Sequence, residues 1–226
     1  MRSGPGTTST ERTSVILDAA GVRLPGDLAV PGGARGVVLF AHGSGSSRHS
    51  PRNRQVAGGL QAAGYGTLLI DLLTEAEERV DAATRALRFD IPLLSGRLTD
   101  AADRLTGAGG LPLAVFGAST GAAAALVTAA GRPDIVRAVI SRGGRPDLAG
   151  SDLARVRAPT LLVVGGADHQ VLELNRQAAA RIVAPHEIVV IPGATHLFPE
   201  EGALEQVVDH AVRWLDRWLP APRGSG

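Results

Sequence analysis

Apolar stretches of strand length alternate along this chain with amphipathic stretches of helical length. The central apolar stretches combine Val, Leu, Ile, Phe and Ala without charge, which is typical of strands covered on both faces of a sheet. Strands are expected at residues 14–18, 22–30, 36–41, 67–70, 113–116, 136–140, 160–164 and 188–191. Helices are expected at residues 51–63, 77–88, 92–106, 121–130, 151–156, 172–182 and 203–219.

This order of elements predicts an α/β protein with a mostly parallel sheet and helices on both faces. The first two strands follow each other without a helix and should form an antiparallel hairpin at one edge. Residues 13–220 are expected to form a single domain, with flexible tails at 1–12 and 221–226. Because no connection is long enough for a separate lid, we expect an open site at the carboxyl ends of the strands and no large cap.

Composition narrows the classes of function. The chain has 23 basic and 22 acidic residues and no run of five like charges, which argues against nucleic acid as a partner. It contains no cysteine, which excludes disulfides, thiolate metal sites and a cysteine nucleophile and fits a cytoplasmic location. No apolar run reaches 18 residues, so no membrane span is expected.

A glycine-rich pentapeptide follows the predicted strand at 113–116. Residues 117–121 read Gly-Ala-Ser-Thr-Gly and precede a predicted helix. A tight strand-to-helix turn with this pattern exposes the serine hydroxyl, and its small neighbours avoid clashes. The pattern alone also suits a plain glycine-rich turn, but its position between a strand and a helix favours Ser119 as a nucleophile.

A serine nucleophile needs a base, and the base needs an acid to orient it. In strand-to-helix folds of this kind the acid and then the histidine follow the serine along the chain, each after its own strand. Asp168 follows the predicted strand at 160–164, and His196 follows the last predicted strand. We therefore predict a Ser119, Asp168 and His196 triad, with Asp147 as the alternative acid.

The loop after the third predicted strand, residues 42–47, reads His-Gly-Ser-Gly-Ser-Ser. Acyl transfer places negative charge on a carbonyl oxygen, which two backbone N–H donors can stabilise. The amide of Thr120, directly after the nucleophile, and the amide of Ser44 are the expected donors. The same loop also resembles the start of a dinucleotide site, but Arg48 stands where that fingerprint requires its third glycine.

Several basic side chains follow the predicted strand ends: Arg48, His49, Arg52, Arg142 and Arg145. Arginine is well suited to hold a carboxylate or phosphate group, so Arg48 and Arg142 are candidates for binding an anionic part of a substrate. Ordinary salt bridges with loop acids such as Glu75, Glu77 and Glu78 are an equally good interpretation.

Four segments together resemble the dienelactone hydrolase-like branch of the α/β-hydrolases: residues 42–47, 117–121, 141–147 (Ser-Arg-Gly-Gly-Arg-Pro-Asp) and 193–196 (Gly-Ala-Thr-His). The resemblance covers about residues 14–219. It implies an eight-stranded sheet, hydrolysis of esters or lactones without a cofactor or metal, and triad positions at Ser119, Asp168 and His196. The dienelactone hydrolases proper use cysteine where this chain has serine. Similar domains also occur fused to phosphoribosyltransferases.

The expected activity is therefore serine-dependent hydrolysis of a small ester or lactone through an acyl-enzyme. A thioesterase or an acyltransferase would use the same residues. A binding module without catalytic activity is the alternative from another class. The sequence does not indicate the natural substrate or the oligomeric state.

Overall fold

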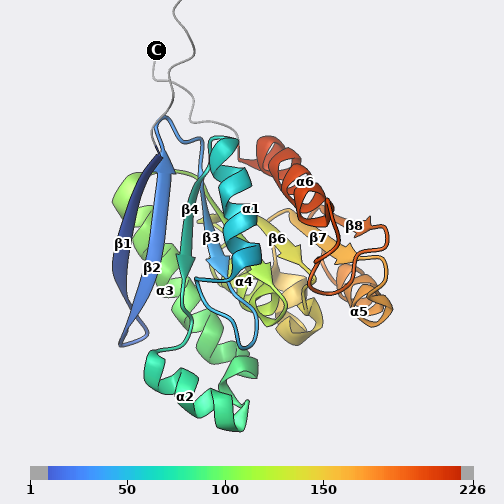
Figure 1. Ribbon diagram of the computed structural model, residues 1–226, viewed down its shortest axis with the longest axis horizontal. Helices are drawn as coiled ribbons and strands as arrows, with labels where there is room; N and C mark the ends of the chain where they lie inside the picture. Colours follow the sequence, from blue (N-terminus) through green and yellow to red (C-terminus); the bar gives the residue numbers. More distant parts are fainter. Residues whose placement is uncertain (1–9, 220–226) are drawn as a thin grey trace, which may run out of the picture.

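The computed structural model describes residues 10–219, whose strands form one eight-stranded sheet in the order β1-β2-β4-β3-β5-β6-β7-β8 (Figure 1). The strands are β1 (Thr10–Ala19), β2 (Val22–Pro31), β3 (Val37–Ala41), β4 (Gly66–Ile70), β5 (Leu113–Ala118), β6 (Val136–Arg142), β7 (Thr160–Gly165) and β8 (His186–Ile191). β2 pairs antiparallel with β1 and with β4, and all other pairs are parallel. The predicted mostly parallel sheet with an antiparallel edge is confirmed.

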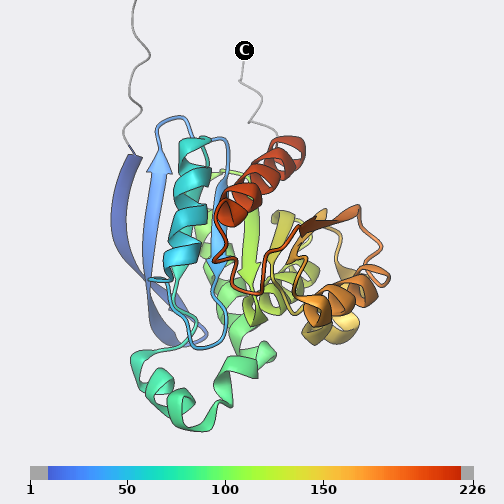
Figure 2. The same ribbon diagram turned by 45° about the vertical axis from the view of Figure 1, so that its right-hand side comes forward.

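Helices cover both faces of this sheet. They are α1 (Pro51–Ala62), α2 (Glu75–Thr84), α3 (Ile91–Gly109), α4 (Thr120–Gly131), α5 (His169–Ala179) and α6 (Ala203–Trp218), with the 3₁₀ segments η1 (Leu87–Phe89) and η2 (Pro146–Arg155). α1 and α6 lie on one face and α3, α4 and α5 on the other, while α2 extends beyond the carboxyl ends of the strands (Figure 2). Within residues 10–219, no helix combines the length and the apolar character needed to cross a bilayer.

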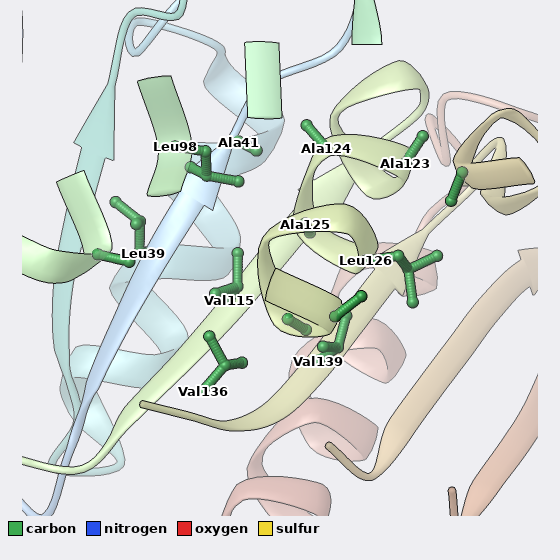
Figure 3. Packing of buried hydrophobic residues seen from close by; sticks show 14 of the residues in the cluster. Leu39, Ala41, Leu98, Val115, Ala123, Ala124, Ala125, Leu126, Val136 and Val139 are labelled. Carbon is green, nitrogen blue, oxygen red and sulfur yellow. The ribbon is translucent and has the colours of Figure 1, made fainter. Parts of the chain in front are cut away.

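The core depends on small side chains where α4 meets the sheet. Ala123, Ala124 and Ala125 of α4 are fully buried against strand residues such as Val115 and Val139 (Figure 3). Alanine lets a helix approach a sheet closely, so the start of α4 is held directly above the end of β5. With few aromatic residues in the chain, aliphatic packing of this kind supplies most of the core.

Helix caps set where the helices begin beside the strand ends. The Ser50 hydroxyl accepts a hydrogen bond from the Asn53 amide at 3.3 Å, and Pro51 occupies the first turn of α1. Thr74 and Glu77 form a capping box at the start of α2. These caps place the N-termini of α1 and α2 at the edge of the sheet where the parallel strands end.

Some boundaries differ from the expectation. β1 begins at Thr10, because its pairing with β2 continues to Pro31, so the last three residues of the expected tail 1–12 lie in a strand. η2 begins at Pro146, before the expected start at residue 151, and it is kinked at Gly150. Residues 1–9 and 220–226, which hold nearly all of both expected tails, lie outside the described residues.

Candidate active site

Ser119 sits in a sharp turn between β5 and α4, with φ 51° and ψ −122°. A serine in this region of backbone space is strained and persists only where the surroundings hold it. A Cβ on Gly117 would lie 2.4 Å from Cα of Ala122, and a Cβ on Gly121 would lie 2.4 Å from the carbonyl oxygen of Ala41. Both glycines are therefore required by the close approach of neighbouring backbone.

Backbone hydrogen bonds from the end of β6 hold the same turn. The Ser119 amide donates to the carbonyl of Arg142 at 3.3 Å, and the Arg145 amide donates to the carbonyl of Ser119 at 3.0 Å. Gly143 and Gly144 lie between these two arginines, and a Cβ on Gly144 would lie 2.5 Å from Cβ of Ala122. The segment after β6 therefore packs directly against the turn that carries Ser119.

Asp168 and His196 are in direct contact. Nδ1 of His196 lies 2.7 Å from Oδ2 of Asp168, so the ring donates to the carboxylate and its Nε2 is left facing away from it. The other carboxylate oxygen accepts from the Val171 amide at 3.4 Å and caps α5. One carboxylate thus both starts a helix and orients an imidazole.

The loop that carries His196 is anchored by two residues that the sequence analysis did not single out. The amide and hydroxyl of Thr195 both donate to Oε1 of Glu200, at 3.0 Å and 2.6 Å. Phe198 is buried in the core with a positive φ of 55°. The only sequence signal for this anchor is that Phe198 lies two positions after the predicted base His196, and Glu200 four positions after it.

The His196 ring lies close to the serine turn. A Cβ on Gly143 would lie 3.7 Å from Cε1 of His196, and Gly143 directly follows the residue that accepts the Ser119 amide. Within residues 10–219 no hydrogen bond joins the Ser119 hydroxyl to the ring. Such bonds are commonly long in unliganded hydrolases and shorten when a substrate is bound.

The loop after β3 approaches Ser119 from the other side. A Cβ on Gly43 would lie 2.9 Å from Cβ of Ser119, so only glycine permits this approach. The hydroxyls of Ser44 and Thr120 are 3.1 Å apart, which places the two expected oxyanion donors in neighbouring positions. In the described part of the chain, neither of their backbone amides donates a hydrogen bond.

His42 holds this loop in place, a role that the sequence analysis did not assign. Its Nε2 accepts from the Leu72 amide at 3.0 Å, so its Nδ1 carries the proton and donates to the Gly43 carbonyl at 3.0 Å. Burial lowers the pKa of His42, which keeps the ring neutral as this arrangement requires. His42 therefore ties the loop to the end of β4.

The structure separates the candidate arginines. Arg48 forms an ion pair with Asp71, which also accepts from the Arg48 amide at 2.7 Å, and Nε of Arg48 lies 3.7 Å from Asp27. Arg48 is thus engaged by two carboxylates, and binding of a substrate by Arg48 stays a prediction. Asp147, the alternative acid, pairs with Arg145 at 2.7 Å.

Arg142 differs from these arginines. Its side chain is only 7% exposed, and within residues 10–219 it has neither an acceptor nor an ion-pair partner. The structure brings it beside Ser119 through the backbone contact at the end of β6.

A cleft of about 670 Å³ opens next to the loop after β3. Ser44 and Thr120 are among its lining residues, and α2 and η1 contribute Glu78, Asp81 and Arg88 among others. The expected open site is therefore bordered on one side, because the residues of α2 and η1 extend above the strand ends.

The wall formed by α2 is held by a buried ion pair, which leads to an expected pH dependence. Arg97 donates to both carboxylate oxygens of Glu77 at 2.6–2.7 Å, and this contact lowers the pKa of Glu77 from 4.5 to about 2. A lowered pKa in the folded state stabilises the protein above the unfolded value of 4.5, and this stability is lost as the pH falls toward about 2.

Denaturant unfolding should therefore show Glu77→Gln to be less stable than the wild type near neutral pH. The difference between the two should shrink as the pH falls below about 4.5. Glu75→Gln is the control, since the Glu75 pair with Arg79 is exposed on the same helix and should contribute little. An equal, pH-independent effect of both substitutions would contradict this interpretation.

Comparison with known proteins agrees with this fold. The model of the dienelactone hydrolase family matches residues 24–218. A dienelactone hydrolase from Anabaena variabilis has 53% sequence identity and a TM-score of 0.89, with 92% of this chain and 98% of that chain covered. Est1E from Butyrivibrio proteoclasticus has 17% identity and a TM-score of 0.73, with 91% and 98% covered, and shows the fold alone.

Two curated relatives from Mycobacterium tuberculosis strains, each named a putative phosphoribosyl transferase, are 56% identical over 215 residues. The match covers 94% of this chain and 48% of each relative, so the chain spans about half their length. The sheet and its flanking helices form an α/β-hydrolase fold, and the match of a family model to most of the residues establishes the relationship. The chain belongs to the dienelactone hydrolase family.

Proposed function

We propose that this protein is a serine hydrolase that cleaves carboxylic ester or lactone bonds through an acyl-enzyme. The observation that carries the proposal is the 2.7 Å contact of Asp168 with the ring of His196, next to a strained Ser119 at the head of α4. A strained serine turn, an oriented imidazole and two free amides are the parts that acyl transfer needs.

In the first step the Ser119 hydroxyl attacks the carbonyl carbon while Nε2 of His196 accepts its proton. Asp168 holds the ring by its Nδ1–H and stabilises the imidazolium that forms. The amides of Ser44 and Thr120 donate to the carbonyl oxygen as it becomes negative. The tetrahedral intermediate then collapses, and His196 returns the proton to the leaving alcohol, or to the ring-opened oxygen of a lactone.

In the second step water attacks the acyl-serine ester. His196 accepts a proton from this water, and the same two amides stabilise the second tetrahedral intermediate. Collapse releases the carboxylic acid and returns the proton to Ser119. The cleft beside Ser44 and Thr120 is the space proposed for the part of the substrate that extends away from the scissile bond.

The names of similar proteins favour acyl transfer over the other reactions considered for this site. One solved structure of Est1E is described as having ferulic acid bound, and another similar structure is described as a cold-adapted esterase. The phosphoribosyl transferase name belongs to relatives about twice as long, so we propose the hydrolase chemistry for the part that this chain matches. Thioesters and transfer to an alcohol acceptor remain chemically equivalent uses of the same residues.

The experiment that tests the proposal is labelling of the full chain with a neutral fluorophosphonate probe, read by intact-protein mass spectrometry. The wild type should gain one adduct, located on Ser119, since only a serine activated by a base reacts readily. His196→Ala should lose the labelling, because Ser119 then has no base. A protein that stays unlabelled while folded would indicate a binding module instead, and a label on another serine would reject Ser119 as the nucleophile.

A further inference from the structure

Among the described residues, no counter-ion faces Arg142 at the end of β6 or Arg52 in the first turn of α1. The Nη1 atom of Arg142 and the Nε atom of Arg52 are buried without a hydrogen-bond acceptor. No ion pair or side-chain hydrogen bond of either residue occurs within residues 10–219. Arg48 and Arg145 differ in that each contacts a carboxylate, although the Nε atom of Arg48 is also buried without a hydrogen-bond acceptor.

An unpaired buried guanidinium is costly, because its charge has left water without gaining a partner. Burial, and after it the positive charge of Arg52, lowers the pKa of Arg142 to about 10. Arg142 therefore still carries its charge at neutral pH, and the positive charge of Arg52 acts against it. An anion that binds both Arg142 and Arg52 would explain why neither arginine has a carboxylate partner among the described residues.

The surroundings add positive potential. Arg52 is in the first turn of α1, a helix of 12 residues that has no acidic residue in that turn. The N-terminus of a helix carries a partial positive charge and unpaired amides, which favour anions. The first turn of α2, in contrast, carries three acidic residues.

The position of this cluster connects it to the proposed chemistry. Arg142 is the last residue of β6, pairs in register with Ala118, and its carbonyl accepts from the Ser119 amide at 3.3 Å. An anion held by the Arg142 side chain would therefore lie within the reach of a small molecule whose carbonyl carbon is at Ser119. The anion is then a part of the substrate that is bound but not changed.

We infer that Arg142 and Arg52, with the N-terminus of α1, form a binding site for a phosphate group. Resting on the hydrolase function proposed above, the substrate is an ester or lactone that carries a phosphate group near the scissile bond. A phosphate is favoured over a carboxylate because it carries up to two negative charges and three terminal oxygens, which match two guanidinium groups. A single carboxylate would neutralise only one of the two arginines.

Inorganic phosphate is the probe, and thermal unfolding of the full chain in phosphate-free and phosphate-containing buffer of equal ionic strength is the first measurement. Phosphate should raise the Tm of the wild type, because a ligand that binds only the folded state stabilises it. Without phosphate, Arg142→Gln should melt at or above the wild type, since it removes an unpaired buried charge. With phosphate, the order should reverse.

Binding of phosphate measured by calorimetry should weaken at least about tenfold in Arg142→Gln, because charge-assisted hydrogen bonds are lost. Arg52→Gln is the second variant and keeps the test valid if Arg142→Gln does not fold. Arg155→Gln is the matched control, because Arg155 is exposed and pairs only with Asp152. It should bind phosphate like the wild type.

No rise in wild-type Tm and no measurable binding would overturn the inference, as would binding that Arg142→Gln and Arg52→Gln leave unchanged. An equal response to acetate would overturn the choice of phosphate and point to a carboxylate. The fluorophosphonate label keeps this inference separate from the proposed function. Labelled Ser119 without phosphate binding rejects only the site, and phosphate binding without labelling rejects only the hydrolase.

Discussion

Ser119→Ala should reduce the turnover of a short p-nitrophenyl ester by about 10⁴- to 10⁶-fold, as expected for the loss of a nucleophile in a triad. The reason is that alanine removes the hydroxyl of the proposed nucleophile, which lies in the strained turn at φ 51°. The measurement is kcat/KM of purified variants, with the acyl-enzyme followed by mass spectrometry. Turnover within tenfold of the wild type would reject Ser119 as the nucleophile.

The control for this experiment is Ser119→Gly, which removes the hydroxyl and also the backbone strain. The strain at a position such as Ser119 costs about 1–3 kcal/mol of folding free energy, which glycine relieves. Roughly 0.5–1 kcal/mol of this gain is lost again, because the unfolded chain is more flexible with glycine. Ser119→Gly should therefore be inactive and more stable than Ser119→Ala in denaturant unfolding. An inactive variant with raised stability shows that activity was lost with the chemical group and not with the fold.

Gly121→Ala should lower the free energy of unfolding by at least about 3 kcal/mol, or roughly 6–12 °C in Tm for a chain of this size. The added Cβ would lie 2.4 Å from the carbonyl oxygen of Ala41 and 2.5 Å from that of His42. Both contacts are with backbone, which cannot rotate away as a side chain could. Relief requires α4 to move from the end of β3, which should also displace Ser119 and reduce labelling by the fluorophosphonate.

Gly131→Ala is the matched control, because Gly131 is the last residue of the same helix. A Cβ there would meet no atom within 4 Å, so the substitution should be neutral or stabilise by up to about 1 kcal/mol. Thermal unfolding of the two variants side by side separates helix propensity from close packing. Equal effects of the two substitutions would show that the space around Gly121 is not what makes glycine necessary.

Sequence patterns located the serine turn, the acid and the histidine because each lies directly after an apolar strand. The chain order of these residues and the rule that parallel strands end at one edge were enough to place them near one another. The same reasoning made Arg48 and Arg142 equal candidates for binding an anion, since both follow strands. It had no means of telling them apart, because the partner of Arg48 is Asp71 and not one of the glutamates that the spacing suggested.

The residues that fix the loops of the site by hydrogen bonds also could not be identified from the sequence. His42 acts through the Leu72 amide, 30 positions away, and Glu200 acts through two atoms of Thr195. Neither contact follows from a repeat or a motif. Each depends on how two segments cross, which is set by the packing of helices and strands far from the site.

The order of apolar and polar positions alone settled the sheet, its antiparallel edge and the strand ends that carry the candidate residues, because burial of strands is a local property with a fixed period. The folded molecule decided which charges are paired. Arg48 lies against Asp71, whereas Arg142 is buried without a partner among residues 10–219. Charge pairing depends on distances between segments remote in the chain, and no local pattern encodes such distances.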